Sequence, residues 1–155
     1  MELSNMKKEV IGIYRSELER QANIYKESME YEQATANEHV GAMESRYDTF
    51  KEEAQDRKSA LAKQLSNVLS LLSLLFHIKS NPSHKVEFGS IVFTNEEHKA
   101  FFMFPNVLEN DQNISDWRIQ AISPSSPIGK NQFLNKQVGD EIEFLKRKYR
   151  ITGII

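Results

Sequence analysis

The feature that most constrains this fold is a run of apolar side chains in residues 47–75 whose spacing alternates between three and four. Its positions are Tyr47, Phe50, Ala54, Leu61, Leu65, Val68, Leu72 and Leu75, and Arg57 fills the one interrupted place. Such spacing puts a narrow apolar seam on an α-helix, as in a coiled coil. No proline occurs before Pro82 to break such a helix. The spacing therefore predicts a helix over about 43–78, roughly 50 Å long.

A second, looser stripe of the same kind lies upstream, at Leu3, Met6, Val10, Tyr14, Leu18, Tyr25 and Met29. A chain reversal near residues 39–41 would set Leu18 opposite Leu61, Tyr14 opposite Leu65, and Met29 opposite Phe50. Because these pairs are apolar, the two helices can pack antiparallel. We predict that residues 1–80 form a helical coiled-coil hairpin with its tip near residues 38–44.

The sequence changes character at residues 80–85, "SNPSHK". Five short segments beyond it are rich in aromatic and β-branched residues, as strands are: 86–93, 99–104, 116–122, 140–145 and 148–155. Residues 126–135 predict a short helix with Ser126 as its N-cap and Pro127 at its first position. The predicted class is α+β, and residues 84–155 form an antiparallel β domain wrapped on a helix.

Composition excludes several classes of protein. The chain has no cysteine, which excludes disulfides and thiolate chemistry and fits a reducing compartment. Its net charge of -2 gives no general attraction to nucleic acid or anionic membranes. The charged N-terminus lacks the apolar core of a signal peptide, and the most apolar run, residues 65–76, is shorter than the ~20 residues that span a bilayer. We expect a cytoplasmic monomer with no membrane contact.

Candidate chemistry is sparse along the chain. The four histidines (His39, His77, His84 and His98) have no metal-ligand spacing, and there is no Gly-x-Ser-x-Gly elbow or phosphate-binding glycine loop. The basic run Lys146, Arg147 and Lys148, with Arg150, either contacts phosphate or is a solvated strand end, which leaves DNA binding open.

The one local charge anomaly lies around the predicted tip. Residues 27–53 contain eight carboxylates, at Glu27, Glu30, Glu32, Glu38, Glu44, Asp48, Glu52 and Glu53, against two bases, Arg46 and Lys51. These acids either form a solvated flank or carry oxygen ligands to a cation such as Mg²⁺.

Two motifs of the C-terminal half are distinctive. The chain has Ser126-Pro127-Ile128-Gly129 and later Val138-Gly139-Asp140-Glu141-Ile142-Glu143. With these motifs it resembles the C-terminal domain of the bacterial Gre transcript-cleavage factors, a family that shows a Ser-Pro-Ile/Leu-Gly/Ala stretch, a short helix, and Val-Gly-Asp before an alternating strand. "VEFGSIVF", with Gly89, resembles the family's first strand. The order of a helical hairpin and then a β domain also agrees, so the resemblance covers nearly the whole chain.

The resemblance implies a function. The hairpin of such factors enters the secondary channel of bacterial RNA polymerase, and tip carboxylates help to hold a Mg²⁺ ion of the polymerase active site. The polymerase then cleaves the 3′ end of its own backtracked RNA, so the factor contacts nascent RNA only indirectly and is not itself an enzyme. The resemblance also implies that the loop Ser125-Ser126-Pro127, followed by Ile128 and Gly129, docks on the polymerase.

The tip departs from the family pattern, in which an Asp and a Glu three residues later form the catalytic pair. Aligning on Glu38-His39 puts Gly41 at the Asp place and Glu44 at the Glu place. Aligning on Tyr47 puts Val40 and Met43 there instead. We therefore take Glu44 as the expected metal ligand, with Asp48 and Glu38 as the nearby catalytic candidates.

Two other functions stay open. The first is a relative that does not support cleavage and modulates transcription by occupying the channel. The second is a prolyl isomerase or chaperone, because the family's C-terminal domain is similar in fold to FKBP-type isomerases. That activity needs an aromatic-lined pocket, for which Trp117, Phe101, Phe102 and Phe104 are the candidates.

Overall fold

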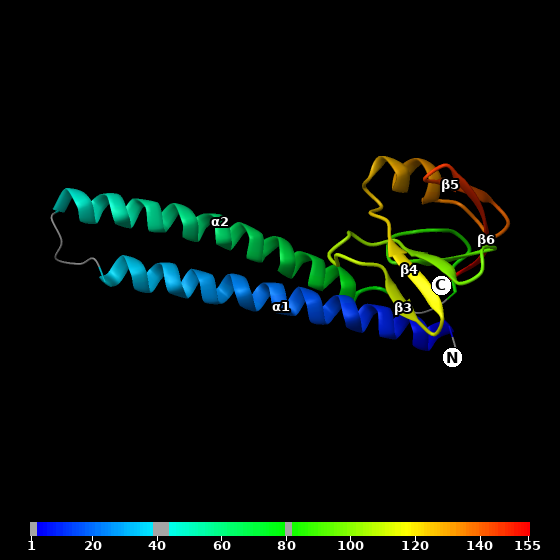
Figure 1. The fold of residues 1–155 in the computed structure, drawn as a ribbon, viewed down its shortest axis with the longest axis horizontal. Coiled ribbons are helices and arrows are strands. Elements are labelled where there is room, and N and C mark those ends of the chain that lie inside the picture. The colour runs from blue at the N-terminus through cyan, green and yellow to red at the C-terminus, as the bar shows by residue number, and fades with distance from the viewer. Residues whose placement is uncertain (1–2, 39–43, 80–81) are drawn as a thin grey trace. The chain divides into compact units, whose positions relative to one another are not determined.

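Two long helices are followed by six strands and one short helix (Figure 1). The structure, a computed structural model, describes residues 3–38, 44–79 and 82–155, and it describes no side chains for residues 35–38, 44–48 and 50. The elements are α1 (Leu3–Glu38), α2 (Glu44–Phe76), β1 (Ile91–Thr94), β2 (Lys99–Phe102), β3 (Gln112–Ile114), β4 (Trp117–Ala121), η1 (Gly129–Phe133), β5 (Glu141–Phe144) and β6 (Arg147–Ile154). The predicted α+β class is confirmed.

The chain divides into two compact units, residues 15–76 and residues 1–14 with 77–155. We call them the hairpin unit and the β unit. The first 14 residues, predicted to belong to the hairpin, therefore pack with the β unit. Whether residues 1–80 and residues 84–155 fold independently of each other stays a prediction.

The hairpin unit contains the apolar seam that the sequence predicted. Leu18 and Ala22 on α1 are buried, as are Ala54, Val68 and Leu75 on α2. In Figure 1 the helices α1 and α2 run side by side along this unit. With the half-buried positions 58, 61, 65 and 72 included, the covered positions of α2 repeat every three to four residues. Each helix therefore presents one narrow face to the other.

The predicted register of the two helices is wrong. It would put Arg57 opposite Ala22, but the Arg57 Nε atom lies 2.8 Å from Glu32 Oε2, about ten residues further along α1. The Lys58 ammonium donates to Gln33 Oε1 over 2.9 Å and supports the same register. An apolar seam repeats every ~3.5 residues, so a slide of about three repeats preserves it. Apolar spacing therefore selects the contact face of each helix but not the axial register.

The β unit is a six-stranded sheet in the order β3-β4-β2-β1-β6-β5. The prediction of a purely antiparallel sheet of five strands needs two corrections. Strands β2 and β4 pair in parallel, and β3, which pairs antiparallel with β4, was not predicted. The sequence of β3, Gln-Asn-Ile, has one apolar residue in three and so lacks the alternation that marks a strand.

Neighbouring residues of β2 supply two different cores, because side chains alternate between the faces of a strand. The ring centroid of Phe101 lies 5.0 Å from that of Phe133 on η1 and 5.4 Å from that of Phe144 on β5. The Phe102 ring instead lies 4.9 Å from the Tyr14 ring of α1. One face of the sheet is thus covered by η1, where Phe144 of the edge strand β5 also packs, and the other face is covered by the N-terminal part of α1.

The segment Lys51–Phe76 of α2 is long and apolar enough, by length and composition alone, to cross a membrane. Its first eight residues nevertheless include six charged side chains. One of them, Arg57, forms the ion pair with Glu32 on α1. The expectation of no membrane contact stays a prediction.

Candidate functional site

The predicted docking loop connects β4 to η1 and is held by its own serines. The Ser126 hydroxyl donates to the carbonyl oxygen of Ser123 over 2.6 Å and accepts from the backbone N–H of Gly129 over 3.1 Å. The second bond joins a residue to the N–H three positions later, which is N-cap geometry. The prediction that Ser126 caps the short helix, with Pro127 at its first position, is confirmed.

The short helix itself differs from an ordinary α-helix. Residues Gly129–Phe133 form a π-helix, and the N–H of Leu134 donates to the carbonyl of Gly129 over 2.9 Å. A Cβ atom added at Gly129 would lie 2.1 Å from the carbonyl oxygen of Ser123. Only glycine allows this approach, so the start of the helix is packed directly on the loop backbone.

The five predicted docking residues divide into two groups by exposure. Ser125 and Pro127 are exposed, while Ser126 and Ile128 are half-buried and Gly129 is buried. Ile128 packs against the core of the β unit, and the Ser125 hydroxyl lies 3.0 Å from that of Ser123. The geometry therefore leaves Ser125 and Pro127 to contact a partner, while the other three residues fix the shape of the loop.

The predicted catalytic residues lie at the ends of the two long helices. Glu38 is the last residue of α1, Glu44 is the first of α2, and Asp48 lies one turn further on. The side chains of all three lie outside the described residues, and so do positions 39–43. Their roles, and the role of Glu44 as a metal ligand, stay predictions. Within residues 3–38, 44–79 and 82–155, no group of three or more described His, Asp or Glu side chains can hold a metal ion.

The aromatic residues considered for an isomerase pocket are packing residues. Phe101, Phe102 and Phe104 are fully buried. Trp117 is half-buried, with its ring 4.9 Å from Phe93 and 6.2 Å from His98. These side chains pack within the β unit.

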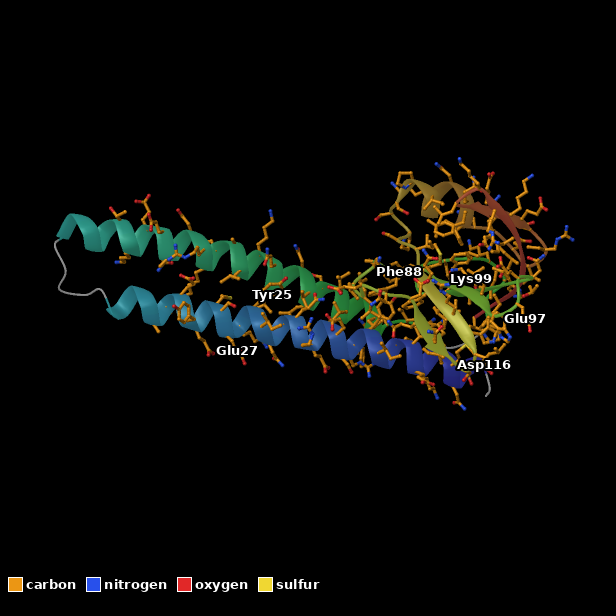
Figure 2. All side chains as sticks on the ribbon, in the orientation of Figure 1. Tyr25, Glu27, Phe88, Glu97, Lys99 and Asp116 are labelled. Atoms are coloured by element: carbon orange, nitrogen blue, oxygen red, sulfur yellow. The ribbon has the colours of Figure 1, made fainter. Side chains whose placement is uncertain are left out.

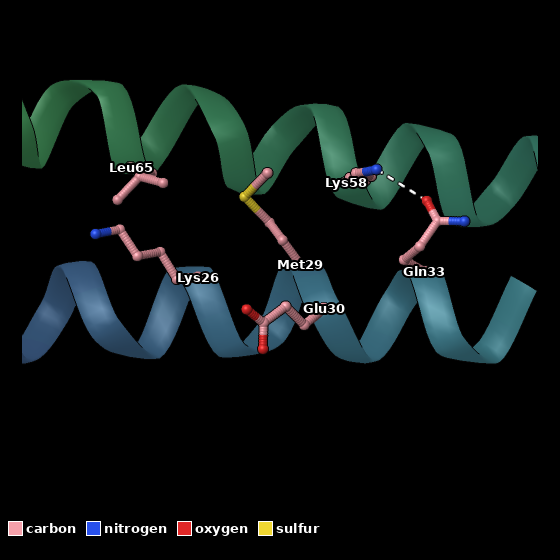
Figure 3. A pocket seen from close by; sticks show the side chains of 6 residues that line it. All are labelled: Lys26, Met29, Glu30, Gln33, Lys58 and Leu65. Carbon is pink, nitrogen blue, oxygen red and sulfur yellow. Dashed lines mark hydrogen bonds between the residues drawn. The ribbon is translucent and has the colours of Figure 1, made fainter.

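A groove between α1 and α2 was not predicted from the sequence. It has a volume of about 360 Å³ and is lined by Lys26, Met29, Glu30, Gln33, Lys58 and Leu65 (Figure 3). Figure 3 shows Lys26 facing Leu65 across the gap and Met29 reaching toward α2. The sequence signal for this groove was that polar residues, Lys26, Glu30 and Gln33, lie beside the apolar stripe of α1 here.

Buried Lys7 was also missed. It lies on α1 in the β unit and is only 4% exposed. Burial lowers the pKa of Lys7 from 10.5 to about 8, although the nearby charge of Glu87 opposes this shift. Lys7 adjoins Met6 in the sequence, so its position beside the apolar stripe was the signal for its burial. Figure 2 shows the labelled side chains Phe88, Glu97, Lys99 and Asp116 on the same unit.

No family model and no curated protein matches this sequence. Solved structures do match. The chain is similar to GreA factor homolog 1 (Gfh1) of Thermus thermophilus, with 19% identity, 91% of this chain and 94% of that chain covered, and a TM-score of 0.35. A second structure, of the transcription factor Gfh1, shows 19% identity, coverage of 90% and 92%, and a TM-score of 0.37. Gfh1 of Thermus aquaticus shows 20% identity, coverage of 88% and 90%, and a TM-score of 0.32.

The chain's own elements agree with the fold that the resemblance implied. A pair of long antiparallel helices precedes a sheet of six strands, and a capped short helix at Ser126-Pro127 precedes β5. The fold is therefore α+β, with a pair of long helices followed by a six-stranded sheet.

Proposed function

We propose that this protein is a transcription elongation factor that binds bacterial RNA polymerase and inserts its hairpin unit into the secondary channel. The observation that carries the proposal is the pairing of α1 (36 residues) with α2 (33 residues). Ion pairing of Arg57 with Glu32 and hydrogen bonding of Lys58 with Gln33 join the two helices. A pair of helices of this length would carry the carboxylates at the helix ends, Glu38 and Glu44, to a distant site.

The docking loop supplies the second part of the proposal. The cap of Ser126 and the close packing of Gly129 hold the loop in one conformation, so little conformational entropy is lost when a partner binds. Ser125 and Pro127 are the exposed residues of this loop, and we assign the direct contact with the polymerase to them.

Cleavage of backtracked RNA is the finer part of the proposal. Glu44 would hold a Mg²⁺ ion together with the polymerase, because Mg²⁺ prefers carboxylate oxygens and accepts few protein ligands. When bound, this ion polarises the phosphate and activates water. Glu38 and Asp48 would orient the same site. In this proposal the chain has no active site of its own and acts in the cytoplasm as a monomer that meets nascent RNA only through the polymerase.

The tip sequence favours a second candidate, a factor that occupies the channel without supporting cleavage. The family's catalytic Asp is replaced by Gly41 or, in the other alignment, by Val40. A site that has lost one of two carboxylates holds a divalent cation less tightly.

A cleavage assay on a stalled, backtracked polymerase with 5′-labelled RNA separates these candidates. We expect the wild-type chain to shorten the RNA, Glu44→Ala to abolish shortening while it still binds, and Glu52→Ala to retain it. Glu52 is a matched control because it is an exposed acid on the same helix. Binding without RNA shortening at any Mg²⁺ concentration would leave the channel-occupying function. Absence of binding to core polymerase would refute both functions.

A further inference from the structure

The hairpin turn between β5 and β6 has an unusual sequence for its conformation. Phe144 pairs with Arg147, which leaves Leu145 and Lys146 as a two-residue loop. Their φ angles are 50° and 65°. A two-residue loop with positive φ at both positions is a type I′ turn, in which Asn-Gly is preferred because a Cβ atom is unfavourable there. The turn is therefore strained at two successive residues.

Packing within the chain does not offset this strain. Leu145 is 76% exposed, so its side chain gains little from burial in the fold. Strained backbone of this kind clusters at functional sites such as ligand clamps, where contacts with a partner can offset the strain.

The charges around the turn indicate what the partner is. The Arg147 guanidinium lies 3.0 Å from Glu96, and Glu143 and Lys148 are cross-strand neighbours in the β5–β6 ladder. Glu141 is likewise the cross-strand neighbour of Arg150, so each of these bases lies beside or opposite an acid, whereas Lys146 in the turn has no acidic residue opposite it. A nucleic-acid backbone is bound by several cations in excess of acids, whereas this turn offers one such cation beside an apolar tip. A protein pocket fits it better.

The turn is also structurally continuous with the docking loop. The Gln132 amide oxygen of η1 accepts from the backbone N–H of Glu143 over 3.3 Å, and the rings of Phe133 and Phe144 lie 6.5 Å apart. Because Phe144 directly precedes Leu145, η1 and the turn belong to one packed block. A partner held at the loop before η1 is thus positioned to meet the turn as well.

We propose that the β5–β6 turn is a second polymerase contact, in which Leu145 enters an apolar pocket and Lys146 meets a carboxylate at its edge. The identity of the partner rests on the function proposed above. The position and chemistry of the contact are inferred from the conformation, exposure and charges of the β5–β6 turn.

The test replaces the turn with the sequence that its backbone prefers, using Leu145→Asn together with Lys146→Gly in the full chain. Relief of strain should raise the melting temperature by roughly 3–8 °C. Loss of Leu145, which is buried in the polymerase pocket in the proposed complex, should raise the Kd for core polymerase about tenfold to hundredfold. A variant that is more stable yet binds less tightly cannot owe its defect to misfolding.

The β3–β4 turn provides a matched control. Ser115 and Asp116 also have positive φ angles, 49° and 69°, between the paired residues Ile114 and Trp117. Ser115→Asn with Asp116→Gly should stabilise the fold without changing the Kd for polymerase. Wild-type affinity in the Leu145/Lys146 variant would overturn the second contact alone, as would a loss confined to binding of single-stranded RNA. A wild-type chain that does not bind polymerase would overturn the proposed function and this contact with it.

Discussion

Replacing Gly129 by alanine tests whether the docking loop depends on direct backbone packing. The added Cβ atom would lie 2.1 Å from the carbonyl oxygen of Ser123 and 3.1 Å from the Cα atom of Pro124. Both neighbours are backbone atoms, so no side-chain rotation relieves the contact. The loop must move by roughly 1 Å, since carbon and oxygen atoms that are not bonded pack at ordinary van der Waals separation.

The movement of the loop lowers the free energy of unfolding by an amount that follows from its contacts. The Ser123 carbonyl accepts from the Ser126 hydroxyl, and the same hydroxyl accepts from Gly129. Overpacking costs about 1–3 kcal/mol, and weakening two hydrogen bonds adds about 1–2 kcal/mol. We therefore expect Gly129→Ala to lower the free energy of unfolding by roughly 2–5 kcal/mol and to weaken polymerase binding, because Ser125 and Pro127 move with the loop.

Urea denaturation followed by Trp117 fluorescence measures this effect within the β unit, because the chain has a single tryptophan. Gly12→Ala is the matched control. Nothing lies within 4 Å of a Cβ atom at Gly12, and alanine in a helix is more stable than glycine by about 1 kcal/mol. The control should thus be stabilised. A Gly129→Ala protein that unfolds within ~0.5 kcal/mol of wild type and binds polymerase normally would refute the packing argument.

Two further predictions concern Lys7 and the hairpin register. The pKa of Lys7 is about 8 in the folded chain, whereas its ordinary value is 10.5. Between pH 8 and pH 10.5 the unfolded chain therefore binds more protons than the folded chain does. The free energy of unfolding consequently rises over this range. Lys7→Met should remove that rise and stabilise the chain at pH 7 by roughly 1–2 kcal/mol; an unchanged pH profile in urea denaturation would contradict the burial of the ammonium. The natural chain has no cysteine, so Gln33→Cys with Lys58→Cys should be linked by a short bis-maleimide. Leu18→Cys with Leu61→Cys should not be linked, and the reverse result would restore the register predicted from apolar spacing.

The sequence predicted the features of this fold that depend on local chemistry. The three-four spacing indicated two seamed helices, and a serine before a proline indicated the cap at Ser126. The π-helix was not predicted, and neither was the close approach of Gly129 to the Ser123 carbonyl, which only the folded loop creates. The parallel pairing of β2 with β4 was missed for the same reason, since strand order is set by contacts between distant segments.

The candidate site was predicted unevenly. The loop at Ser125–Gly129 carries a distinctive sequence and follows β4, and its docking role remains a prediction. The tip residues Glu38, Glu44 and Asp48 lie outside the described side chains and remain predictions. The turn at Leu145-Lys146 gave no signal, because its residues are not those that a type I′ turn prefers. Residue preferences identify a turn only when its residues are the ones that the turn type favours, so they miss a turn such as Leu145-Lys146.

The ion pair between Arg57 and Glu32 contributes little to stability but can select the axial register of the two helices. The Arg57 side chain is half exposed, and exposed pairs of this kind contribute little to stability. The apolar seam, however, is satisfied equally well after a slide of about three repeats. A polar pair that fits only one register can therefore select among nearly equal alternatives. In the hairpin unit, whose proposed task is to carry carboxylates at the ends of α1 and α2, axial register determines how these helix ends lie relative to each other. The seam stabilises the hairpin unit, and the polar contacts of Arg57 and Lys58 determine its alignment.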